Sequence, residues 1–156
     1  QHIGGAIALM YGDTGHWPIW VDGTETKSTS GDYNTLYSAD GTMPDVGTTG
    51  WTVATNADDF ENQIVNNTPG DVAAAAYPTT GRRAWRGPYL EKVLGDPWGS
   101  KYLINVEFLQ PANVGGVAPV FVLSAGPNKL VETVFDQTST GPSLTRGGDD
   151  VIFRIK

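Results

Sequence analysis

The segment IGGAIALMYGDTGHWP, residues 3–18, decides the fold class because it places a helix ahead of every strand signal. Its apolar residues recur at helical spacing. They are Ile3, Ala6, Ile7 and Met10, with Leu9 and Tyr11 widening the stripe. Gly12 and Gly15 then end the helix, and Pro18 prevents its continuation. A helix of about a dozen residues is marginal alone in water, so we expect the tail of a longer helix that packs on other elements.

The last third of the chain predicts an antiparallel sheet. Residues 101–108 alternate between two faces, residues 120–123 form a continuous apolar run, and residues 151–156 alternate again. A helix followed by strands predicts the α+β class. We expect the N-terminal helix to pack on a C-terminal antiparallel sheet of three or more strands, with long loops between the elements.

Residues 19–84 give weaker signals. Leu36-Tyr37 and Trp51-Thr52-Val53 have the composition of short strands. Asn56 is the expected N-cap of a short second helix, in which Phe60 and Ile64 share one face.

Composition limits the possible functions. The 156 residues suit a single domain, residues 1–156. The net charge of −7 argues against a nucleic-acid partner, because phosphate binding needs a basic surface. The charge is uneven, since residues 1–80 hold ten acids against one lysine and residues 81–156 hold seven acids against nine bases. Opposite ends of two subunits could therefore attract each other, although a solvated acidic face explains the same count.

Catalytic patterns are missing from the sequence. There is no cysteine, and the two histidines have no partner at metal-ligand spacing. Ser124 is followed by Gly126 but lacks the preceding glycine of a nucleophile elbow. We therefore expect no enzyme activity and no catalytic residue. The basic cluster of Arg82, Arg83 and Arg86 either contacts an acidic neighbour or is a solvated loop that packs on Trp85.

Three blocks of sequence, in this order, resemble the major pseudopilins of type II secretion systems. The helix-end block is AIALMYGDTGHWP at residues 6–18. The Asp-Pro-Trp-Gly block combines WRGPYL at residues 85–90 with DPWGSKY at residues 96–102. The Ser-x-Gly block combines SAGPN at residues 124–128 with GDDV at residues 148–151.

The resemblance implies a domain plan and a structural function. Residues 1–18 would be the end of a stalk helix and its turn, residues 19–84 a variable region, and residues 85–156 the sheet region. The protein would be a subunit of a periplasmic pseudopilus whose partners are other pseudopilin subunits and the secretion machinery. No stretch here reaches the roughly 20 apolar residues that span a bilayer. The hydrophobic helix that anchors such subunits in the inner membrane would therefore lie ahead of Gln1.

The resemblance also implies a calcium site, since the corresponding loop of major pseudopilins binds calcium through carbonyl groups and Asp side chains. Such oxygen ligands are the ones that calcium takes. By position its ligands would be the Ala125 carbonyl, Asn128, and Asp149 or Asp150. Asn128-Lys129 stands where the family has Asp-Gly, which removes a negative side chain and adds a positive one. The alternative is a loop without metal, closed by hydrogen bonds from backbone amides to Asp149 and Asp150.

Two other functions remain open. A type IV pilin shares the helix-on-sheet plan. A secreted glycan-binding β module would use Trp17, Trp20, Trp51 or Trp85 as exposed stacking platforms. Such modules do not begin with a helix, so the first element distinguishes them. If Trp98 anchors its turn by packing in the core, it is expected to be buried.

Overall fold

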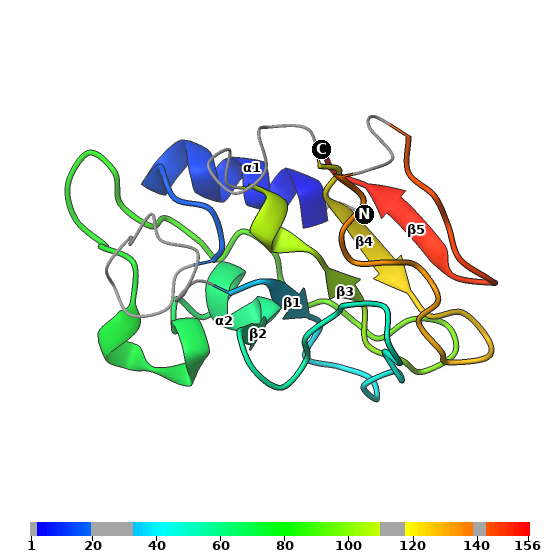
Figure 1. Cartoon of the computed structure of the whole chain (residues 1–156). Coiled ribbons are helices and arrows are strands. Elements are labelled where there is room, and N and C mark those ends of the chain that lie inside the picture. Colours follow the sequence, from blue (N-terminus) through cyan, green and yellow to red (C-terminus); the bar gives the residue numbers. More distant parts are fainter. Residues whose placement is uncertain (1–2, 20–32, 110–117, 139–142) are drawn as a thin grey trace.

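The computed structural model describes residues 3–19, 33–109, 118–138 and 143–156 and shows a mixed α+β fold (Figure 1). In this part of the chain the α-helices are α1 (Ile3–Thr14) and α2 (Phe60–Ile64). The strands in these residues are β1 (Thr35–Tyr37), β2 (Ala57–Asp59), β3 (Leu103–Ile104), β4 (Phe121–Ser124) and β5 (Val151–Arg154). They form one sheet in the order β2-β1-β3-β4-β5, in which only β1 and β2 are parallel. Short 3₁₀ turns cover Pro69–Asp71 (η1), Ala73–Ala75 (η2) and Val106–Leu109 (η3).

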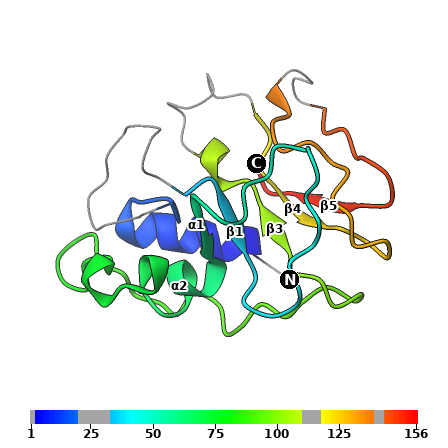
Figure 2. The ribbon, with the colours of Figure 1, turned by 60° about the horizontal axis from the view of Figure 1, so that its bottom comes forward.

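The predicted N-terminal helix is confirmed as α1. Its inner face buries Ala6, Ile7 and Met10 in the hydrophobic core, and α2 lies beside it (Figure 2). The prediction that Leu9 and Tyr11 widen the buried stripe is wrong, because these side chains are 64% and 41% exposed. They lie about 100° to either side of the Met10 position on the helix.

The end of α1 is fixed by local hydrogen bonds. The Thr14 hydroxyl donates to the Met10 carbonyl at 2.8 Å and accepts from the His16 amide at 3.0 Å. Gly15 follows with a φ of 73° and donates its amide to the Tyr11 carbonyl. A left-handed glycine directly after the last turn is a common helix stop.

The antiparallel part of the sheet is confirmed, but its first predicted strand is too long. Pairing in β3 stops at Ile104, and the chain turns into η3 where residues 105–108 were expected to continue the strand. Asn105 explains the change, since its side chain accepts from the Phe121 amide at 2.8 Å and donates to the Pro119 carbonyl at 3.0 Å. A buried amide side chain thus replaces the backbone ladder.

Residues 33–59 extend the sheet beyond the predicted strands. β1 confirms the strand signal at Leu36-Tyr37, whereas Trp51-Thr52-Val53 is not a strand. Trp51 is instead a core residue whose ring nitrogen donates to the Thr133 carbonyl at 2.9 Å. β2 was not predicted.

The expected N-cap of α2 is also wrong. Asn56 lies before β2 with a φ of 54°, and Asp59 caps α2 by accepting from the Glu61 amide at 2.9 Å. The predicted shared face of Phe60 and Ile64 is confirmed, because both side chains are fully buried.

Glu61 joins two distant segments to the start of α2. Its carboxylate accepts from the Ala39 amide at 3.0 Å and from the Val93 amide at 2.9 Å. Asp59 lies beside it. Burial, followed by a hydrogen bond with the Glu61 side chain, raises the pKa of Asp59 to about 7, and Lys101 opposes that shift.

We expect Asp59→Asn to flatten the pH dependence of stability between about pH 5 and about pH 8. Above a pKa of 3.8 the unfolded chain releases a proton that folded Asp59 keeps until about pH 7. The free energy of unfolding contributed by Asp59 therefore falls as pH rises through this window. Asparagine is uncharged and still caps the helix. Urea unfolding at both pH values tests this, and an equal pH dependence in the two proteins would contradict it.

Candidate calcium-binding loop

The antiparallel pairing of β4 and β5 brings the predicted calcium residues to one end of the sheet. Ser124 pairs with Val151, so the chain that leaves β4 lies beside the chain that enters β5. Ala125 and Asn128 follow β4, and Asp149 and Asp150 precede β5. The hypothetical β-carbon of Gly126 would lie 2.6 Å from the Asp149 carbonyl oxygen, which shows how closely the two halves of the Ser-x-Gly block approach.

Asp150 closes this loop through backbone amides. Its side chain is fully buried, and Oδ2 accepts from the Glu132 amide at 2.9 Å and the Thr133 amide at 2.6 Å. This is the contact expected for a loop held without metal. The other oxygen, Oδ1, is buried and has no hydrogen-bond donor among the described residues.

Asp149 has a similar unpaired oxygen. Its Oδ2 accepts a long hydrogen bond of 3.4 Å from the Asn128 amide, and its Oδ1 is buried without a donor in the described part of the chain. Buried carboxylate oxygens without a partner are unfavourable unless water or a cation satisfies them. This pair of oxygens is the observation that fits calcium, for which Asp149 and Asp150 would supply the charge.

Asn128 is engaged within the loop itself. Its Oδ1 accepts from the Leu130 amide at 2.8 Å, and its Nδ2 donates to the Glu132 carboxylate at 3.0 Å. Ala125 is fully buried beside it. Across the described residues, no three His, Cys, Asp or Glu side chains converge as a metal-binding group. A calcium shell would therefore need backbone carbonyls and water to complete it, which predicts weak binding.

Glu132 is the loop residue that the sequence-based ligand set left out. Its Oε2 also accepts from the Asp149 amide at 3.4 Å. The signal for it was modest, since Glu132 and Asp136 are the only acids between residues 132 and 148.

Lys129 adopts a backbone conformation that suits glycine, with a φ of 60°. We expect Lys129→Gly to raise the free energy of unfolding by about 1 kcal/mol, because relief of left-handed strain exceeds the entropy cost of glycine. Lys129→Ala is the matched control, since it removes the charge but keeps the β-carbon, and it should give no gain. Thermal and urea unfolding measure both variants. An equal gain in the two would assign the effect to charge.

Asp96 connects the Asp-Pro-Trp-Gly block to the Ser-x-Gly block. Its buried carboxylate accepts from the Trp98 amide at 3.0 Å, the Ser100 amide at 2.7 Å and the Ser124 hydroxyl at 2.5 Å. The Ser124 oxygen in turn accepts from the Gly126 amide at 3.2 Å. The expectation that the Trp98 ring anchors this turn in the core is wrong, because Trp98 is 38% exposed. Asp96 holds the turn by accepting hydrogen bonds from the backbone amides of the turn, and the Trp98 ring is left partly exposed.

The helix-end block contacts the first half of the Asp-Pro-Trp-Gly block. Tyr89 accepts from the Arg86 amide at 2.9 Å, and the Asp13 carboxylate at the end of α1 lies close enough to the Tyr89 hydroxyl to influence its pKa. Burial, helped by Asp13, raises the pKa of Tyr89, and Arg86 opposes that shift. The Arg83 guanidinium lies against Gly15, where an added β-carbon would meet it at 1.9 Å. The arginine cluster is thus exposed, with one member covering the helix end.

Three of the tryptophans proposed as glycan platforms pack against other aromatic rings. Trp51 is 5% exposed and packs edge-on against Phe121 and Phe135. Trp17 stacks on Tyr11 with ring centroids 3.9 Å apart. Trp85 packs edge-on against Tyr89 at 5.5 Å, and Trp20 lies outside the described residues. The prediction of an exposed platform is therefore wrong for Trp51.

The chain matches no known protein-family model, no curated protein and no solved structure. Among the described residues, no helix combines the length and apolar character needed to cross a bilayer.

Proposed function

We propose that this chain is the globular domain of a non-enzymatic subunit of a periplasmic pseudopilus filament, the filament of a type II secretion system. In the cell it would be anchored in the inner membrane by an N-terminal helix, face the periplasm, and bind neighbouring subunits and the secretion machinery. The observation that carries the proposal is that the three sequence blocks which resemble the family meet in space.

Each junction between the blocks consists of specific contacts. The helix-end block meets the first part of the Asp-Pro-Trp-Gly block where the Asp13 carboxylate lies near the Tyr89 hydroxyl. Asp96 and Ser124 join the second part of that block to the Ser-x-Gly block. Segments scattered along the chain therefore build one continuous frame, which is what we expect of a family signature whose purpose is structural.

The position of α1 supports the helix-on-sheet plan of a pilin-like domain. Ala6, Ile7 and Met10 enter the single core cluster that also contains the sheet residues Leu103 and Leu123. Near its beginning, Gly4 faces the Ile155 side chain that follows β5, where an added β-carbon would lie 3.1 Å from it. The helix is thus fixed to both the core and the end of the sheet.

The buried acids also support a structural role. Asp58, Asp96 and Asp150 each accept from backbone amides, and Glu61 binds two segments of chain. Carboxylates used in this way hold loops in place. The glycan-binding alternative loses support, because a helix precedes the strands and Trp51 is buried.

Deletion of the gene in its own bacterium tests the proposal. We expect exoproteins to accumulate in the periplasm, and the full-length protein to restore their release and to appear in filaments when overproduced. Glu91→Gln, on an exposed side chain, is the control that should complement fully. Loss of surface pili with normal secretion would instead identify a type IV pilin. Normal secretion without any filament would refute both.

A further inference from the structure

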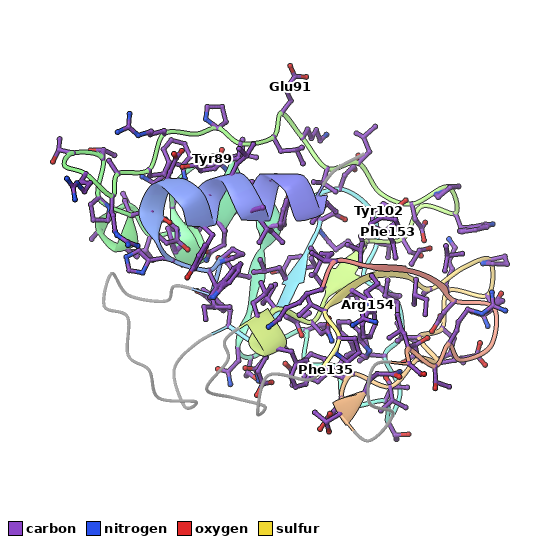
Figure 3. The ribbon with its side chains drawn as sticks, turned by 90° about the horizontal axis from the view of Figure 1, so that it is seen from above. Tyr89, Glu91, Tyr102, Phe135, Phe153 and Arg154 are labelled. Carbon is purple, nitrogen blue, oxygen red and sulfur yellow. The ribbon has the colours of Figure 1, made fainter. Side chains whose placement is uncertain are left out.

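A groove of about 760 Å³ opens beside the beginning of α1. Residues 90–95 and strands β4 and β5 form its other walls. Its apolar lining consists of Ile3, Leu90, Val93, Leu94, Tyr102, Val122 and Phe153. Leu94 is 62% exposed and Phe153 is 71% exposed, and Figure 3 shows Phe153 next to Tyr102. A single exposed apolar side chain is ordinary, but several gathered in one groove indicate a binding surface.

The lining of this groove includes a positively charged side chain. Lys92 belongs to the lining, and among the described residues it forms an ion pair with Asp40 at 3.7 Å, between side chains that are 58% and 50% exposed. Such exposed pairs hold a side chain weakly. The neighbouring Glu91 points away from the body of the molecule (Figure 3) and does not neutralise the groove. The occupant of this site should therefore be apolar and carry a negative charge.

A segment with that chemistry lies elsewhere on the same chain. Residues 71–74, Asp-Val-Ala-Ala, are all exposed where η1 passes into η2, and we call them the 71–74 knob. Val72 is 51% exposed, and Ala73 and Ala74 continue its apolar surface. The Asp71 carboxylate forms no ion pair with any described residue. The knob thus offers an apolar tip with an acid beside it.

We propose that the 71–74 knob of one copy docks into the Leu94–Phe153 groove of the next copy, with Asp71 facing Lys92. This inference rests on the proposed filament function and names the surfaces that would carry it. The knob lies near α2, at the end of the molecule opposite β5, as Figure 1 and Figure 2 show. Contact between two different surfaces of one chain repeats from copy to copy, and it builds an open filament when its rotation does not close a ring.

Engineered cysteines give a direct test, because the natural chain contains no cysteine. Val72→Cys and Leu94→Cys are prepared as separate proteins, mixed at about 1 mM to imitate the concentration that a filament imposes, and oxidised. With equal amounts of the two proteins, we expect the mixed disulfide to exceed each symmetrical dimer by clearly more than the twofold ratio that random pairing gives. Val134→Cys is the matched control partner for Leu94→Cys, since Val134 is also 51% exposed but lies elsewhere. Equal yields with Val72→Cys and Val134→Cys would refute the contact.

Charge exchange then separates docking from chance collision. Lys92→Glu in one protein should lower the mixed yield about fivefold, and Asp71→Lys in its partner should restore it. Failure of the exchange to restore the yield would contradict the Asp71–Lys92 pairing. A different outcome would overturn the inference. The chain would bind anionic phospholipid vesicles, Phe153→Ser would abolish that binding, and no mixed disulfide would form. The groove would then be a membrane-binding site.

The proposed function can fail independently of this contact. Cells that carry aspartate in place of both Val72 and Leu94 could still form filaments and secrete normally. In that case the proposed contact is wrong and the proposed function is unaffected. If the mixed disulfide forms specifically but deletion of the gene affects neither secretion nor filaments, the contact is supported and the proposed function is wrong.

Discussion

Replacing Asp96 by alanine should lower the free energy of unfolding by about 3–5 kcal/mol, whereas Trp98→Ala in the same turn should cost about 1 kcal/mol or less. Asp96 is 5% exposed and is the acceptor for two backbone amides and the Ser124 hydroxyl. Alanine leaves these three donors without an acceptor, and the Ser100 amide and the Ser124 hydroxyl are buried. Trp98 loses little burial, because its ring is 38% exposed.

Asp96→Asn is the matched control for this comparison. Its amide oxygen can still accept from Trp98 and Ser100, while its NH₂ group cannot accept from the Ser124 hydroxyl, so we expect an intermediate loss of about 1–2 kcal/mol. Urea unfolding followed by circular dichroism measures the three variants together. If Trp98→Ala proved the most damaging, the turn would depend on the ring, and the assignment of Asp96 as its anchor would be wrong.

The sequence predicted what depends on neighbours close along the chain. The spacing of Ala6, Ile7 and Met10 is a property of the helix itself, and it predicted both α1 and its buried face. The antiparallel order of the last three strands followed from apolar runs separated by turns. Turn composition likewise located the bend at Asp96, although it assigned the anchoring role to Trp98.

Side-chain contacts that the spacing of the sequence does not reveal set the features that were missed. β2 includes Asp58, which no strand propensity favours, and its buried carboxylate is satisfied by Asn62, Gln63 and Gly70. The early end of β3 depends on Asn105 bonding to a segment that lies beyond residue 117. Neither partner set is visible from spacing, since burial of a polar group depends on which donors the fold brings to it.

The alternating pattern of β5 predicted a strand but could not say which face the rest of the molecule covers. Phe153 and Val151, on one face, are 71% and 51% exposed. For the loop, the resemblance placed Asp149 and Asp150 beside residues 125–128, as the β4–β5 pairing shows. It did not predict that Asp150 would be engaged by the amides of Glu132 and Thr133.

Replacing Asp150 by alanine should also cost about 3–5 kcal/mol, and by the same amount in EDTA as in low-millimolar calcium. The loss arises because the partly buried Glu132 amide and the buried Thr133 amide no longer have an acceptor, and this loss is independent of metal. For the unmodified protein we expect little change in melting temperature between the two buffers. Asn128 is occupied by Leu130 and Glu132, and Lys129 adds a positive charge to the loop.

The substitution Asp149→Asn tests whether Asp149 acts as a calcium ligand or as a structural residue. Asp149 accepts one long hydrogen bond of 3.4 Å, from Asn128, so the substitution should change stability in EDTA by less than about 1 kcal/mol. It would nevertheless weaken any calcium bound by the two unpaired oxygens of Asp149 and Asp150. Calcium at a hundredfold excess over its Kd would stabilise the folded state by about 2.7 kcal/mol. A rise of that size in the unmodified protein, abolished by Asp149→Asn, would show that the loop binds calcium tightly and that our expectation of weak binding is wrong.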